Sequence, residues 1–137
     1  HHLQNVACVS LLQWCAWYSS HYFLWKKCFE TNTPLIVCEH DVELLENIHI
    51  REFDNDMVGL SHNKRNIKNH PIVKHAGGSY FIKPNIAEKL INISNKVIIC
   101  NSDWWLHQHI DDFGKWSISK SIHIIDPNIG ATVTHNK

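Results

Sequence analysis

The run Val9–Phe29 limits the fold more than any other stretch of this chain. Apolar and aromatic side chains recur in it at steps of three and four residues, and neither Gly nor Pro interrupts them. This spacing predicts one long, nearly buried helix, with Ser19-Ser20 as the place for a break. The turn Thr31–Pro34 and the apolar segment Leu35–Cys38 follow, and the segment is typical of a strand covered on both faces. Helix, turn and buried strand together indicate an α/β fold.

The rest of the chain continues this alternation without a repeat, a low-complexity tract or a domain boundary. Pro84 suits the first turn of a helix, and the polar loop from Phe53 to Lys74 leaves room for one short strand. The expected elements after Cys38 are a strand at Met57–Leu60, an apolar stretch at Tyr80–Ile82, a helix at Pro84–Ile91, a strand at Val97–Cys100, a helix at Asn101–His109 and a strand at Ser121–Ile125. We therefore expect a single domain over residues 1–137.

Composition excludes several classes of protein. Among 137 residues, 13 Lys and Arg balance 13 Asp and Glu, so no broad basic surface for nucleic acid is expected. The 5 Cys are an odd number, scattered in mostly apolar surroundings, which favours buried, reduced thiols over a disulfide framework. Neither a leader segment nor an apolar run long enough to span a membrane is recognisable. A cytoplasmic location is the expectation.

Two carboxylates and an imidazole, Glu39, His40 and Asp41, stand directly after the predicted strand Leu35–Cys38. In open α/β sheets, ligands bind outside the carboxyl ends of the strands, so this position indicates a site. Two oxygen ligands separated by one residue suit a hard cation such as Mg²⁺ or Mn²⁺. In the alternative, the acids only cap a helix at Val42–Leu45, whose N-terminus attracts negative charge. Spacing alone leaves both interpretations open.

Four sequence blocks in order carry a family resemblance. They are "SHYFLWKKC" from Ser20, "PLIVCEHDVEL" from Pro34, "GGSYFIKPNIAEKLI" from Gly77 and "NSDWWL" from Asn101. Together they resemble glycosyltransferase family 25, which includes lipooligosaccharide and collagen galactosyltransferases. The resemblance implies a GT-A-like fold, that is, a Rossmann-like mixed sheet flanked by helices. It also implies transfer of a sugar from a nucleotide-sugar donor to an acceptor hydroxyl.

The resemblance also implies roles for individual residues around the acidic motif. Glu39 and Asp41 match the outer acids of the family's metal-binding motif, and His40 replaces its middle acid, so Mn²⁺ or Mg²⁺ is the implied cofactor. Ser20 and His21 match a Ser-His pair placed near the donor or acceptor pocket. The alternative for His21 is a helical histidine packed among aromatic side chains.

Further roles fall on the later blocks. Asp103 matches a later Asp and is the implied general base of an inverting transfer, with a plain helix cap as its alternative. Trp104 and Trp105 could stack on an acceptor sugar or base, since two adjacent Trp in a helix cannot both face the core. Gly77 and Gly78 would let the backbone approach the ligand closely.

Taken together, the residues and the resemblance predict a metal-assisted glycosyltransferase of lipooligosaccharide biosynthesis. The expected donor is a UDP-sugar, and the expected acceptor is a glycan, a protein or a modified base. Only 38 residues precede Glu39, so we expect the N-terminal nucleotide-binding portion to be missing or shortened, as in a fragment of a longer chain. The alternative is a non-catalytic α/β binding module that retains the fold. A zinc site is disfavoured because the densest cluster, His107 to Asp112, lacks the recognised zinc spacings.

Overall fold

The computed structural model describes residues 2–63, 73–74, 78–96 and 102–123, with their side chains except at 2–14, 63, 73, 102–104, 119 and 122–123. The helices are α1 (His2–Glu30), α2 (Pro84–Ser94) and α3 (Ser102–Phe113), with a short 3-10 helix at Ile50–Glu52. The strands are β1 (Leu35–Cys38), β2 (Val42–Leu44), β3 (Met57–Asn63), β4 (Val73–Lys74), β5 (Ser79–Ile82) and β6 (Lys115–His123). The predicted α/β class is confirmed. The strand expected at Val97–Cys100 lies outside the described residues.

Helix α1 is continuous over its 29 residues, so the break considered at Ser19-Ser20 is absent. Its inward face carries His21, Trp25 and Cys28, whose spacing of four and three residues places them on one side of the helix. Phe23 is 66% exposed, so the expectation of a nearly buried helix is wrong for the outward face. No helix in the described part of the chain has the length and apolar character that crossing a membrane requires.

Local signals set the helix ends as expected. Asn32 has a positive φ of 50°, and the N–H groups of Asn32 and Thr33 donate to the carbonyls of Phe29 and Cys28 at 3.2 Å each. This is a Schellman motif, which turns the chain out of α1 and toward β1. Pro84 occupies the first turn of α2, where its missing N–H costs no helical hydrogen bond.

The described strands form a mixed sheet in the order β1-β5-β3-β6-β2, with β4 paired to the end of β3. The pairing is antiparallel except between β3 and β6. Strand β2 pairs with β6, with Val42 opposite His123, so the alternative of a helix at Val42–Leu45 is wrong. Strand β6 begins at Lys115, earlier than the expected start at Ser121, because it includes a bulged stretch that breaks the apolar pattern.

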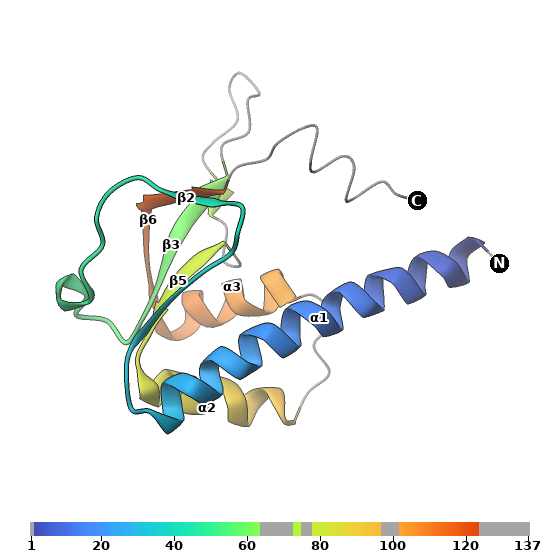
Figure 1. The fold of residues 1–137 in the computed structure, drawn as a ribbon, viewed down its shortest axis with the longest axis horizontal. Helices are drawn as coiled ribbons and strands as arrows, with labels where there is room; N and C mark the ends of the chain where they lie inside the picture. Colours follow the sequence, from blue (N-terminus) through green and yellow to red (C-terminus); the bar gives the residue numbers. More distant parts are fainter. Residues whose placement is uncertain (1, 64–72, 75–77, 97–101, 124–137) are drawn as a thin grey trace, which may run out of the picture.

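The two faces of this sheet are covered differently. Figure 1 shows α1, α2 and α3 on one side of the sheet, and on the other side the connection that carries the 3-10 helix. Side chains alternate between the sides along each strand, as the pleat requires. The helix-covered face carries Val37, Met57, Tyr80 and Ile82, packed with Trp25, Leu90, Leu106 and Ile110 of the helices. The loop-covered face carries Val58, Leu60 and Phe81, packed with Ile48 and Phe53.

The described cysteines correct one expectation. Cys28 is buried against the sheet, and burial raises the pKa of its thiol to about 11. Cys15 and Cys38 are exposed, so mostly buried thiols are not what the described residues show. The exposure of Cys38 also means that β1 is not covered on both faces. Cys38 is the last residue of β1, and neither cluster of buried side chains among the described residues includes it.

Candidate functional site at the end of strand β1

The acidic motif leaves the carboxyl end of β1, as the sequence predicts. The backbone N–H of Glu39 donates to the carbonyl of Gly78 at 2.9 Å, which holds this point of the chain against the start of β5. His40 and Asp41 form the tight connection to β2. Among the described strands, β1 pairs only with β5, so it lies at the edge of the described sheet.

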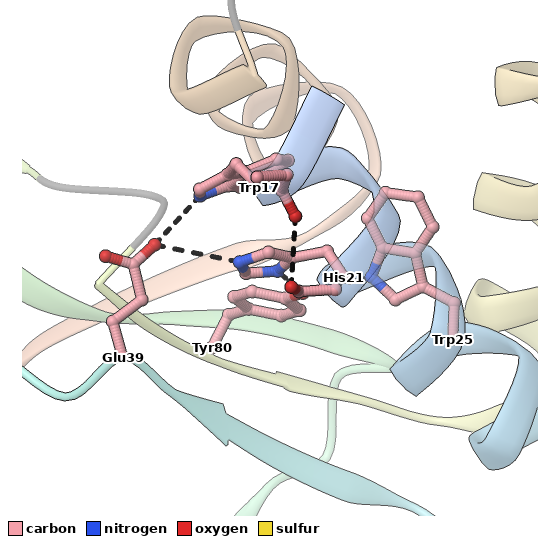
Figure 2. A network of polar contacts seen from close by, with 7 residues as sticks. Trp17, His21, Trp25, Glu39 and Tyr80 are labelled. Atoms are coloured by element: carbon pink, nitrogen blue, oxygen red, sulfur yellow. Dashed lines mark hydrogen bonds and ion pairs between the residues drawn. The ribbon is translucent and has the colours of Figure 1, made fainter. Parts of the chain in front are cut away.

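Glu39 is held by two side chains from α1. The indole N–H of Trp17 donates to Glu39 Oε1 at 2.8 Å, and His21 Nε2 lies 3.6 Å from the same oxygen. Figure 2 shows both contacts reaching Glu39 from the helix, with the other carboxylate oxygen directed away from the two rings. The Glu39 side chain is 25% exposed and that of His21 is 5% exposed, so the pair lies at the border of the core.

His21 combines both interpretations that the sequence left open. Its ring stacks on Trp17, with ring centroids 3.8 Å apart and planes 19° apart, so it is a helical histidine packed among aromatic side chains. The same ring also contacts Glu39 of the acidic motif. Helix α1 therefore brings a residue of the first family block against a residue of the second, across an 18-residue separation in sequence (39 − 21).

Tyr80 on β5 contacts His21 from the side of the sheet. Its hydroxyl lies 2.5 Å from His21 Nδ1 and accepts a hydrogen bond from the Trp25 indole N–H at 3.0 Å. Tyr80 is fully buried, and that burial raises the pKa of its phenol far above the ordinary value, with the Trp25 hydrogen bond opposing the shift in part. The phenol therefore stays protonated and can act as a hydrogen-bond donor.

Sequence reasoning missed Trp17, Trp25 and Tyr80. The signals were present but local: Trp17 and Trp25 lie four residues before and after His21, which places all three on one face of a helix. Tyr80 stands inside the block that begins at Gly77, yet nothing near it in sequence indicates which group its hydroxyl would meet.

Of the other predicted site residues, Gly78 lies against Glu39 through its backbone carbonyl. The Ser20 side chain is exposed, and its hydroxyl donates to the Ala16 carbonyl of its own helix at 3.0 Å. His40 is exposed and Asp41 is half-buried. Trp105 is half-buried, with its ring 5.6 Å from that of Trp25, so it packs toward the core of the helix-covered face.

Three predicted residues cannot be placed fully. Asp103 lies in the first turn of α3, which begins at Ser102, but its side chain is not among those described. The same holds for the Trp104 side chain, and Gly77 lies outside the described residues altogether. The roles of these residues stay predictions.

The expected divalent cation at Glu39, His40 and Asp41 stays a prediction. No group of three or more His, Cys, Asp or Glu side chains within the described ranges could hold a metal ion. Glu39 Oε1 is occupied by Trp17 and His21 instead. A hollow of about 730 Å³ opens on the loop-covered face, and its lining of Ile36 and residues 44–49 does not include the acidic motif.

The His-rich cluster on α3 is also divided among separate contacts. His107 Nε2 lies 3.2 Å from Asp111 Oδ2, and Asp111 Oδ1 accepts the Trp116 indole N–H at 2.8 Å. His109 turns toward Trp105 instead, with ring centroids 4.3 Å apart, and burial lowers its pKa. The two histidines therefore face different neighbours and do not converge on one point.

Comparison with known proteins agrees with the resemblance found in the sequence blocks. Residues 15–70 match the profile of "Glycosyltransferase family 25 (LPS biosynthesis protein)". No curated protein matches the chain. The matched segment covers less than half of the 137 residues, but it includes Trp17, His21 and the whole acidic motif. Over residues 15–70, the chain is therefore similar to glycosyltransferase family 25.

Proposed function

We propose that this chain is part of a GT-A-like glycosyltransferase that moves a sugar from a nucleotide-sugar donor to an acceptor hydroxyl. A UDP-sugar is the proposed donor, and a glycan of the lipooligosaccharide type is the first acceptor to test, ahead of a protein or a modified base. One observation carries the proposal. The family match over residues 15–70 includes both His21 and Glu39, and the fold brings these two side chains to 3.6 Å.

In the proposed reaction, a carboxylate removes the proton of the acceptor hydroxyl as its oxygen attacks C1 of the sugar. The bond between C1 and the phosphate oxygen breaks, and the nucleotide diphosphate leaves with the bonding electron pair. Attack from the face opposite the leaving group inverts the configuration at C1. General base catalysis of this kind contributes on the order of 10²–10⁴-fold. Asp103 is the proposed base, as the family resemblance implies.

Other parts of the proposed site come from the same resemblance. Ser20 and His21 would lie near the donor or acceptor, Trp104 or Trp105 would stack on the acceptor, and the backbone at Gly77 and Gly78 would approach the ligand. Assistance by Mn²⁺ or Mg²⁺ at Glu39, His40 and Asp41 stays a prediction. No step above depends on it, because the described residues do not assemble a metal site.

We also propose a cytoplasmic location. The support is that Cys15, Cys28 and Cys38, the cysteines whose side chains are described, are all free thiols. Reduced thiols are typical of a reducing compartment, where disulfides are rare.

The test is ligand-dependent thermal stability, followed by transfer. A ligand at 100 times its Kd stabilises a folded protein by about 2.7 kcal/mol, so UDP should raise the Tm, and GDP or ADP should raise it less. Each nucleotide is measured with and without Mn²⁺. Release of UDP from UDP-galactose and other UDP-sugars, with lipooligosaccharide as acceptor, then identifies the reaction.

Variants give this test its controls. Asp41→Asn should weaken Mn²⁺ binding at least tenfold if that cation is used, with little change in the Tm of the protein alone. Glu30→Gln is the matched control, because Glu30 is an exposed acid at the end of α1. If no nucleotide diphosphate raises the Tm of the full-length protein under any condition, the alternative of a non-catalytic α/β module replaces the proposal.

A further inference from the structure

A chain of polar contacts runs from the core of the helix-covered face to the end of β1. It begins at the Trp25 indole, passes through the Tyr80 hydroxyl and the His21 ring, and ends at Glu39 Oε1. The first three members are buried, and Glu39 is its partly exposed end. Because an unsatisfied buried polar group costs about 1–3 kcal/mol, the hydrogens in this chain should be arranged so that each group is satisfied.

Counting hydrogens gives the chain a direction. An indole nitrogen can only donate, so Trp25 donates to the Tyr80 oxygen. Tyr80 has one hydroxyl hydrogen left to donate, and His21 Nδ1 lies 2.5 Å from its oxygen. If Nδ1 accepts this hydrogen, the ring carries its own hydrogen on Nε2, which is the nitrogen that faces Glu39 at 3.6 Å.

The opposite direction leaves more groups unsatisfied. A hydrogen on Nδ1 would point at the Tyr80 oxygen, which already accepts from Trp25. The Tyr80 hydroxyl hydrogen would then need a different acceptor, and among the described residues no other hydrogen bond of this hydroxyl is found. Burial also keeps the phenol protonated, since it raises the pKa of Tyr80.

We propose that Trp25 and Tyr80 are positioning residues, which fix the His21 hydrogen on Nε2 so that His21, together with Trp17, holds the Glu39 carboxylate at the end of β1. Glu39 Oε1 is the oxygen that faces Trp17 and His21 of α1. The other carboxylate oxygen of Glu39 points away from the helix (Figure 2). The inference does not depend on the proposed activity, because the position of a hydrogen on His21 can be measured in a protein that transfers no sugar.

The test is ¹⁵N NMR of the histidine ring nitrogens, with the His21 signals assigned by their loss in His21→Gln. In the unmodified protein, Nε2 of His21 should carry a hydrogen and Nδ1 should be a hydrogen-bond acceptor. A hydrogen bound to Nδ1 would overturn the proposal, whatever the result of any nucleotide-binding experiment.

Variants then test the direction of this chain of polar contacts, which we call the relay: Trp25, Tyr80, His21 and Glu39. Tyr80→Phe removes the donor to Nδ1, so the Nδ1 signal should shift, and the Nε2 hydrogen should exchange with water at least tenfold faster. Tyr22→Phe is the matched control, since the Tyr22 hydroxyl donates to Asn95 at 3.5 Å, outside the relay. It should leave the Nδ1 signal in place and change the exchange rate of the Nε2 hydrogen by less than twofold. Equal effects of the two variants would overturn the positioning role.

A milder variant covers the case in which Tyr80→Phe does not fold. Trp17→Phe keeps an aromatic ring stacked beside His21 but removes the N–H that binds Glu39. We expect the His21 hydrogen to stay on Nε2 and to exchange faster, because Glu39 is then held by one partner only. If the hydrogen moves to Nδ1 in this variant, Tyr80 does not set the direction and the proposal fails.

Discussion

The two faces of the sheet differ in what closes them. The helix-covered face is sealed by three helices, and it contains the relay and most of the fully buried large side chains. The loop-covered face is covered by one connecting segment, whose Ile48 and Phe53 pack against the sheet. Nearby, Leu44, Leu45 and Ile50 are 50%, 50% and 42% exposed. Burial of apolar area is the main source of stability, so the helix-covered face should hold the fold together and the loop-covered face should open first.

The largest effect is expected from Trp25→Ala on the helix-covered face. Trp25 is fully buried, and its removal leaves a cavity and takes away the hydrogen bond to Tyr80. Replacing such a residue costs about 3–5 kcal/mol, which urea unfolding would measure. Phe23→Ala is the control, because Phe23 lies on the same helix and is 66% exposed; it should change stability by less than about 0.5 kcal/mol. Similar values for both would break the comparison.

Gly59→Ala should have the next largest effect. A Cβ at this position would lie 2.4 Å from Cε3 of Trp116, closer than any real contact, so the ring has to move. Overpacking of this kind costs about 1–3 kcal/mol. In a Trp116→Leu background the same change should cost much less, and a double-mutant cycle measures the difference. An unchanged cost would show that Trp116 does not limit the packing at Gly59.

Phe53→Ala tests the loop-covered face directly. Phe53 is half-buried, with its ring 4.8 Å from the buried Phe81 ring, and we expect a loss of about 1 kcal/mol. Hydrogen exchange should show faster opening near Val58 and Leu60 and little change near Trp25. The control is Leu45→Ala, which alters an exposed side chain of the same segment. If Phe53→Ala destabilises as much as Trp25→Ala does, the two faces are equally important.

The smallest expected effect is a loss of stability of the connecting segment at low pH, and Lys120 takes part in it. Lys120 in the bulged part of β6 contacts Glu46 and lies 3.0 Å from Glu52, which ties the connecting segment to the sheet. Hydrogen bonds from the His49 backbone and from Lys120 lower the pKa of Glu52. The folded protein therefore binds fewer protons here than the unfolded chain, so the stabilising contribution is present above the unfolded pKa. It is lost as the pH falls through the folded pKa.

Hydrogen-exchange protection factors of residues 45–56 measure this effect, because they are corrected for the intrinsic pH dependence of exchange. Protection should fall as the pH drops below the ordinary pKa of a glutamate, while protection in α1 and β5 stays constant. Lys120→Gln removes the shared partner of both acids and should weaken the pH dependence, while the hydrogen bond from the His49 backbone to Glu52 stays in place. Loss of protection in both faces at the same pH would contradict the comparison.

Local pattern predicted much of the fold. The periodicity of α1, the turn at Asn32, the start of α2 at Pro84 and the strand before Glu39 were all readable, since each depends on residues close together in sequence. Strand β2 was missed, because its three residues show no clear alternation and pair only with the distant β6. The early start of β6 was missed for a related reason, the bulge that interrupts its pattern.

By itself, the sequence determined the α/β class, the helix ends and the resemblance to glycosyltransferase family 25, because these depend on local spacing and on short blocks of residues. It also named His21 and Glu39 as candidates. Only the tertiary structure decided that the two meet, that β1 lies at the edge of the described sheet, and that the Tyr80 hydroxyl contacts His21. The partners of this site are separated by 22, 55 and 59 residues. Contacts over such distances are set by how the sheet and α1 pack, which no local pattern encodes.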